Sequence, residues 1–471
     1  MEKEQSELNE LNAISPIDGR YREKVRELAQ FSSEEALMKN RVEIECKYLA
    51  ALMKNKIICG LPSLSDVMHL ESIIDFFSEK DAKRIKEIEK TTNHDVKAVE
   101  YFLREKFKGT DLEKYSEKIH IGLTSEDVNN IAYTLMLKNG TFNVCVPAIK
   151  KLENKLADLA EEYQVIPMLA RTHGQSASPT TLGKEFANFT YRIFKQRKKL
   201  EKIRLPGKLN GATGNYNAHV IAYPDVDWIQ FSNDFVSSLG LEPNLITTQI
   251  EPHDGFAEIF QGMTRINNVV LDLDKDLWRY ISDNYLLQKP KEGEAGSSTM
   301  PHKVNPIDFE NSEGNLGMAN AMFGYFINKL PISRLQRDLS DSTVSRNFGA
   351  ALAYSLLAYK STLKGLGKIH ADLDYIPSEV KKHPEVLTEA IQTVMRAEDV
   401  PEGYEKMKEL SRGKKITGED LKKFVRSLPL NDDVKERLSI SPLEYIGEAV
   451  KLTHLAVDAI RNDKEINYKQ K

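Results

Sequence analysis

The sequence contains little cysteine and no long apolar run. Its 471 residues include three cysteines, Cys46, Cys59 and Cys145, which lie far apart and form no CxxC motif. This pattern argues against a disulfide framework and against a cysteine-based metal site. The ten histidines form no HxxxH or HExxH pair, which argues against a helical zinc site. No segment approaches the roughly 18 apolar residues of a transmembrane helix, so we expect no membrane partner.

An excess of charge of one sign is also missing. The chain has 66 Lys and Arg against 70 Asp and Glu, a formal net charge of −4, which gives no reason to expect nucleic acid as a partner. Residues 192–208 carry eight Lys and Arg and one Glu. This stretch could bind a polyanion, but we interpret it as a solvated helix face because aromatic side chains do not alternate with the basic ones. The polar segment MEKEQSELNELN lacks the apolar core of a secretory signal, so we expect a cytoplasmic location.

Apolar residues recur at helical spacing through the middle of the chain. After Pro147, one such stripe consists of Ile149, Leu152, Leu156, Leu159 and Tyr163. Further stripes predict helices over 182–203, within the proline-free segment between Pro252 and Pro290, over 307–330 and over 344–366. At 1.5 Å per residue the third helix could reach roughly 50 Å. Sustained spacing of this kind favours near-parallel packing in a bundle.

The two flanks differ from the middle, because they predict shorter helices interrupted by prolines. No strand-like alternation is long enough to build a sheet. We therefore predict an all-α fold with three helical domains and a central long five-helix bundle. The predicted domains are residues 1–112, 113–367 and 368–471.

A glycine-rich loop lies between two of the predicted long helices. Residues 293–306 have the sequence GEAGSSTMPHKVNP, and the glycines permit a backbone that can move and close. The loop supplies two hydroxyls, a cation and an amide, from Ser297, Ser298, Lys303 and Asn305. It could be a flexible connection, but a structural linker has no need for these groups so close together.

A second polar loop, RTHGQSASP at residues 171–179, carries His173 between Thr172 and Gln175. Histidine titrates near neutral pH, so it suits proton transfer to a leaving nitrogen. A single histidine in a loop is also consistent with a solvated or structural role.

Two more polar loops lie in the first third of the chain. Residues 91–102 provide Asn93, His94 and Asp95. Residues 120–130 open a helix, where Thr124 and Asp127 have capping-box spacing, which is a sufficient structural explanation. The same helix start, with its N–H groups beside Thr124 and Ser125, could instead receive a carboxylate or a phosphate.

Arginines complete the set of candidate residues. Arg337, Ser342 and Arg346 are predicted at the start of the fifth long helix, where spacings of five and four place them near one face, and Arg20 with Tyr21 closes the segment SPIDGRY. Guanidinium groups suit phosphate oxygens because they present two parallel donors. Each arginine alone is equally consistent with a surface ion pair.

These motifs together are similar to a known family. GSSTMPHKVNP resembles the fumarase/aspartase superfamily signature GSSxMPxKxN, and RTHGQ, NHD, LTSED, TTQIEPHD and QRDLSDS resemble its adenylosuccinate lyase branch. The stretch SAS at 176–178 departs from the proline- and alanine-rich stretch expected there. The resemblance implies a three-domain helical architecture with a central five-helix bundle, and a homotetramer with shared active sites.

The resemblance also implies a reaction: adenylosuccinate gives AMP and fumarate, and succinyl-aminoimidazole-carboxamide ribotide gives aminoimidazole-carboxamide ribotide and fumarate. It implies Ser297 as general base, His173 as general acid, and Glu310 as the residue that orients the acid. Lys303 and Asn305 would hold substrate carboxylates. Phosphate and ribose contacts would come from Arg20, Tyr21, Arg337, Ser342 and Arg346. Other substrate contacts would come from Asn93, His94, Asp95, Thr124, Ser125, Thr172, Gln249, Ser298 and Met300.

Such chemistry requires no metal and no organic cofactor. Loss of a proton next to a carboxylate gives a carbanion, and fixed cations and donors can stabilise its charge. Other members of the superfamily, such as argininosuccinate lyase or fumarase, are alternatives. A structural protein that retains the lyase scaffold is a third, but it should have lost His173 or Ser297. A helical scaffold for protein contacts would leave the polar loops without a purpose.

Overall fold

The computed structural model describes residues 8–58, 63–289, 304–402, 405, 407, 408 and 416–466. The chain forms two compact units, each assembled from separate segments. Unit 1 contains residues 1–148, 197–267 and 314–358, and unit 2 contains residues 149–196, 268–313 and 359–471. The division into domains at residues 112 and 367 stays a prediction.

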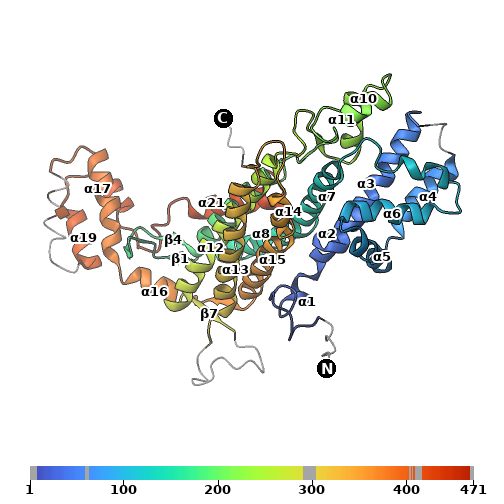
Figure 1. Cartoon of the computed structure of the whole chain (residues 1–471). Coiled ribbons are helices and arrows are strands. Elements are labelled where there is room, and N and C mark those ends of the chain that lie inside the picture. Colours follow the sequence, from blue (N-terminus) through green and yellow to red (C-terminus); the bar gives the residue numbers. More distant parts are fainter. Residues whose placement is uncertain are drawn as a thin grey trace. The chain divides into compact units, whose positions relative to one another are not determined.

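The all-α fold class is confirmed, and each of the five predicted long helices has a counterpart in the structure. These helices are α8 (Val146–Glu162), α9 (Leu182–Leu200), α12 (Asp254–Ser282), α13 (Ile307–Lys329) and α15 (Phe348–Leu366). Figure 1 shows α12, α13 and α15 running side by side. The predicted stripes form the core: Leu152 and Leu156 of α8, Ile193 of α9 and Met263 of α12 are fully buried. Each such side chain contributes about 1.5–3 kcal/mol to folding by leaving water.

The fifth long helix begins later than predicted. A short helix, α14 (Ser340–Ser345), ends first, and α15 then starts at Phe348 rather than at Val344. Phe348 anchors this start, because its ring lies 5.0 Å from that of Phe260 and 5.3 Å from that of Phe326. Aromatic packing therefore fixes where the helix begins, and places Arg346 in the connection just before it. Helix α12 spans 29 residues, or about 43 Å, slightly less than predicted.

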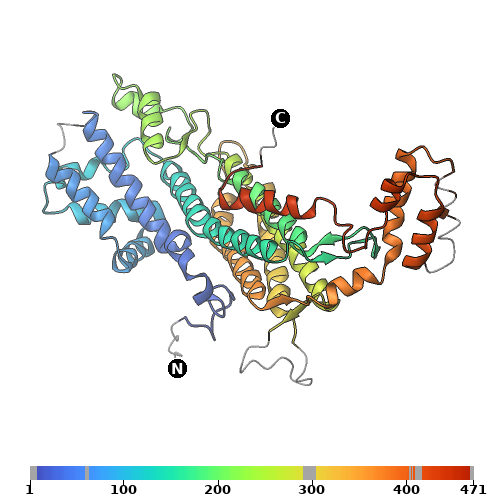
Figure 2. The ribbon, with the colours of Figure 1, turned by 180° about the vertical axis from the view of Figure 1, so that it is seen from behind.

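The remaining elements of unit 1 are mostly short helices. Helices α3, α5 and α6 pack against one another in both views (Figures 1 and 2). The helices, including 3₁₀ and π turns (η), are α1 (Arg22–Val25), η1 (Arg26–Leu28), α2 (Ala29–Ser32), α3 (Glu34–Lys54), α4 (Leu64–Asp75), α5 (Glu79–Thr92), α6 (Asp95–Phe107), η2 (Glu113–Lys118), α7 (Ser125–Gly140), η3 (Thr141–Cys145), α10 (Asn217–Ala222) and α11 (Trp228–Ser238). Two strands, β5 (Pro206–Gly207) and β6 (Glu242–Pro243), pair in parallel.

Unit 2 adds short antiparallel strand pairs and small helices. The pairs are β1 (Pro167–Met168) with β4 (Thr180–Thr181), β2 (Arg171–Thr172) with β3 (Gln175–Ser176), and β7 (Leu286–Gln288) with β8 (Ile369–Ala371). The helices are α16 (Tyr375–Lys381), η4 (Pro384–Leu387), α17 (Thr388–Ala397), α19 (Gly418–Ser427), α20 (Asp432–Arg437) and α21 (Ala449–Arg461). Helices α17 and α19 share a small apolar core around Ile391, Met395 and Val425.

One face of α13 is exposed among the residues that the structure describes. Met318 and Tyr325 are 51% and 56% exposed. Gly314, Gly317 and Ala321 lie on the same face, since all five positions recur at helical spacing and are exposed. These five residues are apolar or small, while exposed Glu310 and Asn328 lie at the same helical spacing toward the two ends of the face. Of the helices described, none combines the length and the hydropathy needed to cross a membrane.

Candidate active site

His173 lies at the tip of a two-residue hairpin in unit 2. Strands β2 and β3 pair Thr172 with Gln175, so His173 and Gly174 form the turn, and both have positive φ angles of 53° and 75°. Two left-handed residues in a row are the geometry of a type I′ turn, which suits the right-handed twist of a hairpin. The tip is exposed, so the imidazole of His173 projects from the chain that carries it.

The other candidate residues of unit 2 lie near or beyond the end of the described segments. Glu310, on α13, is exposed and accepts a hydrogen bond of 3.1 Å from Nε1 of Trp278. Asn305 is half-buried, and Thr172 is exposed beside His173. Four predicted residues fall outside the described residues, and they are Ser297, Ser298, Met300 and Lys303.

In unit 1 the segment NHD connects α5 to α6. Asn93 ends α5 in the left-handed conformation with φ of 49°, and His94 caps α6 by accepting a hydrogen bond of 3.1 Å from the N–H of Lys97 at its Nδ1. Asp95 then turns toward two arginines. Its Oδ2 lies 2.7 Å from Nη2 of Arg41 and 3.4 Å from Nη2 of Arg346. Burial opposes the charge on Asp95, but the two guanidinium groups outweigh it and lower the pKa of this carboxyl.

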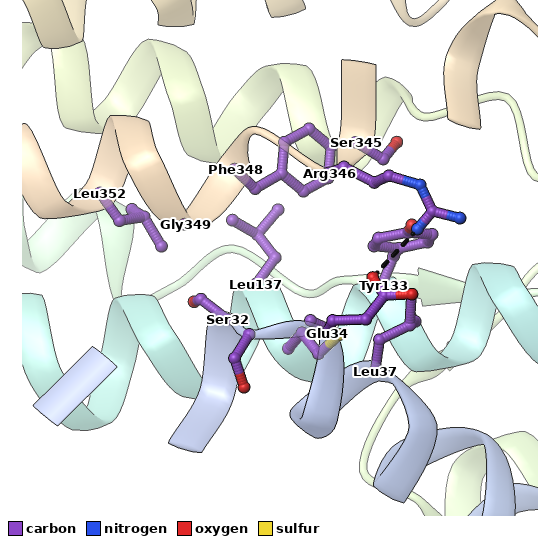
Figure 3. A pocket seen from close by; sticks show the side chains of 12 residues that line it. Ser32, Glu34, Leu37, Tyr133, Leu137, Ser345, Arg346, Phe348, Gly349 and Leu352 are labelled. Carbon is purple, nitrogen blue, oxygen red and sulfur yellow. Dashed lines mark hydrogen bonds and ion pairs between the residues drawn. The ribbon is translucent and has the colours of Figure 1, made fainter. Parts of the chain in front are cut away.

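Arg346 is held by carboxylates on both sides. Besides Asp95, it pairs with Glu34 at 3.2 Å. Figure 3 shows this pair at the edge of a pocket lined by Tyr133, Leu137 and Phe348. The cavity has a volume of about 40 Å³. Arg346 is one of the residues that line this pocket.

The predicted capping box is present at the start of α7. Thr124 and Asp127 bond reciprocally, and the Thr124 N–H donates to Oδ2 of Asp127 at 2.8 Å. Asp127 is fully buried, pairs with Lys208 at 2.9 Å and accepts from the N–H groups of Asn210 and Gly211. The Asp127 carboxylate therefore holds the loop after β5 against the start of α7.

Arg337 lies beside the same helix start. Its Nη1 is 3.0 Å from Oε2 of Glu126 and 3.4 Å from Oε1 of Gln249, while Nε2 of Gln249 donates to the Ala212 carbonyl at 2.9 Å. Ser125 is half-buried on the same turn. Arg337 thus contacts Glu126, the neighbour of Ser125 in the first turn of α7, and it also contacts Gln249. These residues are far apart in sequence but meet at the start of α7.

Arg337 and Arg346 do not share a contact partner in the described structure. Arg337 pairs with Glu126, whereas Arg346 pairs with Glu34 and Asp95. Their predicted placement on one face of the fifth long helix differs from this arrangement, because both lie before α15 begins. Ser342 is half-buried within α14, between the two arginines in sequence.

Arg20 and Tyr21 lie just before α1. Arg20 is exposed, and the ring of Tyr21 has Nζ of Lys24 at 5.5 Å from its centroid. A cation at that distance over an aromatic ring stabilises its orientation weakly.

Comparisons with known proteins agree over almost the whole chain. A lyase family model matches residues 19–322, and an adenylosuccinate lyase C-terminal model matches residues 333–446. The chain is 50% identical to the adenylosuccinate lyase of Escherichia coli K12 and 51% identical to that of Haemophilus influenzae Rd. Each alignment spans 450 residues, covering 95% of this chain and 99% of the relative. This chain belongs to the adenylosuccinate lyase family.

Solved structures support the same fold. The fumarate lyase from Mesorhizobium sp. BNC1 gives a TM-score of 0.73 at 18% identity, covering 93% of this chain and 97% of that one. The 3-carboxy-cis,cis-muconate lactonizing enzyme from Pseudomonas putida gives 0.71 at 17% identity, covering 94% and 99%. The adenylosuccinate lyase family thus shares the helical fold of the wider fumarase/aspartase superfamily.

In this member of the adenylosuccinate lyase family, sequence reasoning missed the partners of the arginines. Arg41 pairs with Asp95, Glu34 pairs with Arg346, and Glu126 pairs with Arg337. A signal for Arg41 was available in the sequence, because it interrupts apolar positions such as Leu37, Met38 and Val42. The structure buries it, at 2% exposed. A buried guanidinium requires a partner. Glu126 stands inside the quoted LTSED motif, where its burial could not be foreseen.

Proposed function

We infer that this chain catalyses the β-elimination of fumarate from adenylosuccinate, giving AMP, and from succinyl-aminoimidazole-carboxamide ribotide, giving aminoimidazole-carboxamide ribotide. Membership of the adenylosuccinate lyase family, at 50% identity over 95% of the chain, is the observation that carries this conclusion. The reaction makes the chain a carbon–nitrogen lyase of purine nucleotide biosynthesis.

The elimination breaks a C–N bond and removes a proton from the neighbouring carbon. In the proposal, Ser297 takes this proton, and His173 gives one to the departing nitrogen. The exposed tip of the β2–β3 hairpin supports the role of His173, because an acid must reach a group outside its own strand pair. Glu310 orients that acid, and its hydrogen bond from Trp278 keeps its carboxylate in a fixed position.

Anion recognition is the second part of the proposal. The carbanion's charge moves onto a carboxylate, which Lys303 and Asn305 hold. Arg337 and Arg346 receive the phosphate, since carboxylates anchor both guanidinium groups while 16% and 40% of the two side chains stay exposed. Arg20, Tyr21 and Ser342 complete the phosphate and ribose contacts. The remaining substrate contacts are Asn93, His94, Asp95, Thr124, Ser125, Thr172, Gln249, Ser298 and Met300.

The proposed assembly is a homotetramer with shared active sites. The uncovered apolar face of α13 supports self-association, because exposed faces of this kind mark protein interfaces. The exposed position of His173 supports sharing, since a neighbouring copy could complete its surroundings. No organic cofactor enters the proposed reaction, and the cytoplasmic location stays a prediction.

The test is a substrate panel with the purified protein. We expect fumarate release from adenylosuccinate and none from argininosuccinate or malate, measured by the rise in fumarate and the loss of adenylosuccinate absorbance. Release from argininosuccinate or malate in preference to adenylosuccinate would assign the chain to another branch of the superfamily. Release from none of the three would refute the enzymatic proposal.

A further inference from the structure

Three buried acidic and imidazole groups meet beside Arg337. Glu126 comes from α7, His253 immediately precedes α12, and Asp341 comes from α14. One polar atom of each lies within 4.8 Å of those of the other two. The three residues are 4%, 3% and 7% exposed. The three segments are far apart in sequence, so the tertiary fold brings these buried side chains together.

Two atoms in this cluster have no hydrogen-bond partner among the described residues. They are Nδ1 of His253 and Oδ1 of Asp341. The His253 ring does bond the Leu330 backbone, which leaves Nδ1 of a neutral ring as an acceptor. Carboxylates and such a nitrogen are all acceptors, so they repel one another at this distance unless a proton lies between them.

The surroundings decide which group carries that proton. Burial raises the pKa of Glu126 to about 8, although Arg337 and Lys208 act in the opposite direction. Burial lowers the pKa of His253, so its ring is neutral at pH 7. A protonated Glu126 can donate to Nδ1 of His253 or to Asp341 through one oxygen. Its other oxygen still accepts from Arg337.

His253 also carries backbone strain. Its φ is 64°, in the left-handed region that residues with a Cβ rarely occupy, and its ring packs 5.2 Å from that of Phe256. Such strain persists only where the surroundings enforce it, and it gathers at functional sites.

We propose that Glu126, His253 and Asp341 share one proton and together position the Arg337 guanidinium for the phosphate of the nucleotide. This inference rests on the proposed function, because it takes that phosphate as the ligand of Arg337. Two carboxylates would outnumber one guanidinium and oppose a phosphate. The shared proton removes one negative charge while keeping a hydrogen bond to Arg337, so the guanidinium stays in place with its charge available.

The test compares two substitutions of Glu126 on two substrates. Glu126→Leu removes both oxygens at similar volume, whereas Glu126→Gln keeps one acceptor and one N–H donor, like a protonated carboxyl. The substrates are adenylosuccinate and its dephosphorylated nucleoside. We expect Glu126→Leu to raise KM for adenylosuccinate at least about 10-fold, with kcat changed less and the nucleoside reaction unaffected. We expect Glu126→Gln to stay within about 3-fold of wild type.

Controls separate positioning from general damage. Asp274→Asn alters another buried carboxyl, in unit 2, and should leave both substrates unchanged. If Glu126→Leu does not fold, Asp341→Leu replaces it, because it removes the carboxylate that shares the proton, and the same contrast with Glu126→Gln is expected. Thermal melting checks the fold of each variant.

Three results would overturn the inference. Glu126→Gln as damaging as Glu126→Leu would show that a full negative charge holds Arg337. An equal loss on both substrates would remove the link to phosphate. One divalent metal ion bound per chain of the purified protein, and lost in Asp341→Asn, would show that a metal ion and not a proton lies between the three side chains. Wild-type protein that releases no fumarate would instead refute the proposed function, so the two failures are distinguishable.

Discussion

At the scale of single residues, left-handed backbone marks several side chains of the candidate site. Asn93, His173 and His253 all have positive φ although none is glycine. Asparagine and histidine tolerate this region better than most residues, which explains their presence at these turns. In each case the backbone, and not the rotamer alone, sets the direction of the side chain.

Gly174 allows a prediction about the His173 turn. Its φ is 75° and an added Cβ would meet nothing within 4 Å, so Gly174→Ala acts through backbone conformation alone. An L-residue in this region costs about 1–2 kcal/mol. We expect Gly174→Ala to lower kcat about 10-fold by shifting His173, with a small loss of melting temperature.

Gly174→Asn is the matched control, because asparagine accepts the left-handed region. It should retain more activity than Gly174→Ala. Equal activity in the two variants would show that this turn does not set the position of the imidazole.

Motifs in the sequence identified candidate residues but not their partners. The quoted NHD motif singles out Asp95, yet its ion pair with Arg41 joins residues 54 positions apart. Likewise QRDLSDS contains Arg337, while its partner Glu126 lies in another motif. Spacing along the chain reports on neighbours within one helix, and contacts between segments depend on the fold.

At the scale of helices, the periodicity of apolar residues predicted which helix faces are buried. The stripes of α8, α9 and α12 are buried as expected, because apolar residues at helical spacing share one face. Boundaries were less predictable. The break between α14 and α15 follows from Phe348 packing on Phe260 and Phe326, which are distant in sequence.

A buried carboxyl between these helices gives a pH-dependent prediction. Asp274 of α12 accepts a hydrogen bond of 2.9 Å from Thr362 of α15, and burial raises its pKa to about 8. The unfolded chain loses this proton near pH 4, whereas the folded chain keeps it until about pH 8. Its contribution to the free energy of unfolding therefore falls as pH rises through this window.

Asp274→Asn removes the titration while keeping a polar side chain. We expect the melting temperature of the variant, relative to wild type, to increase steadily from pH 5 to pH 8. Melting curves at four pH values measure this difference. A difference that is constant or falls with pH would contradict the raised pKa.

At the scale of the whole molecule, the exposed face of α13 is the surface that we propose for self-association. Met318 and Tyr325 lie there with small residues between them. We expect Met318→Glu to shift the protein from the proposed tetramer to smaller species, since a buried unpaired charge is costly. Light scattering after size exclusion gives the mass.

Met68, on α4, is 60% exposed and provides the control. Met68→Glu should leave the mass unchanged. If both variants keep the wild-type mass, the α13 face is not an interface.

Sharing of sites predicts complementation between inactive variants. His173→Ala and Ser297→Ala should each lower turnover at least about 100-fold by removing an acid or a base. If these residues meet from different copies, co-refolding equal amounts restores both in about a quarter of the sites of randomly mixed tetramers. Recovery is measured as fumarate release. A mixture no more active than its components would place both residues in one chain.

The exposed hairpin that carries His173 has one more consequence. If the sites are shared as proposed, another copy of the chain completes the surroundings of this exposed imidazole. Catalytic output per molecule should therefore decline on dilution below the association threshold, even though each protomer keeps its helices.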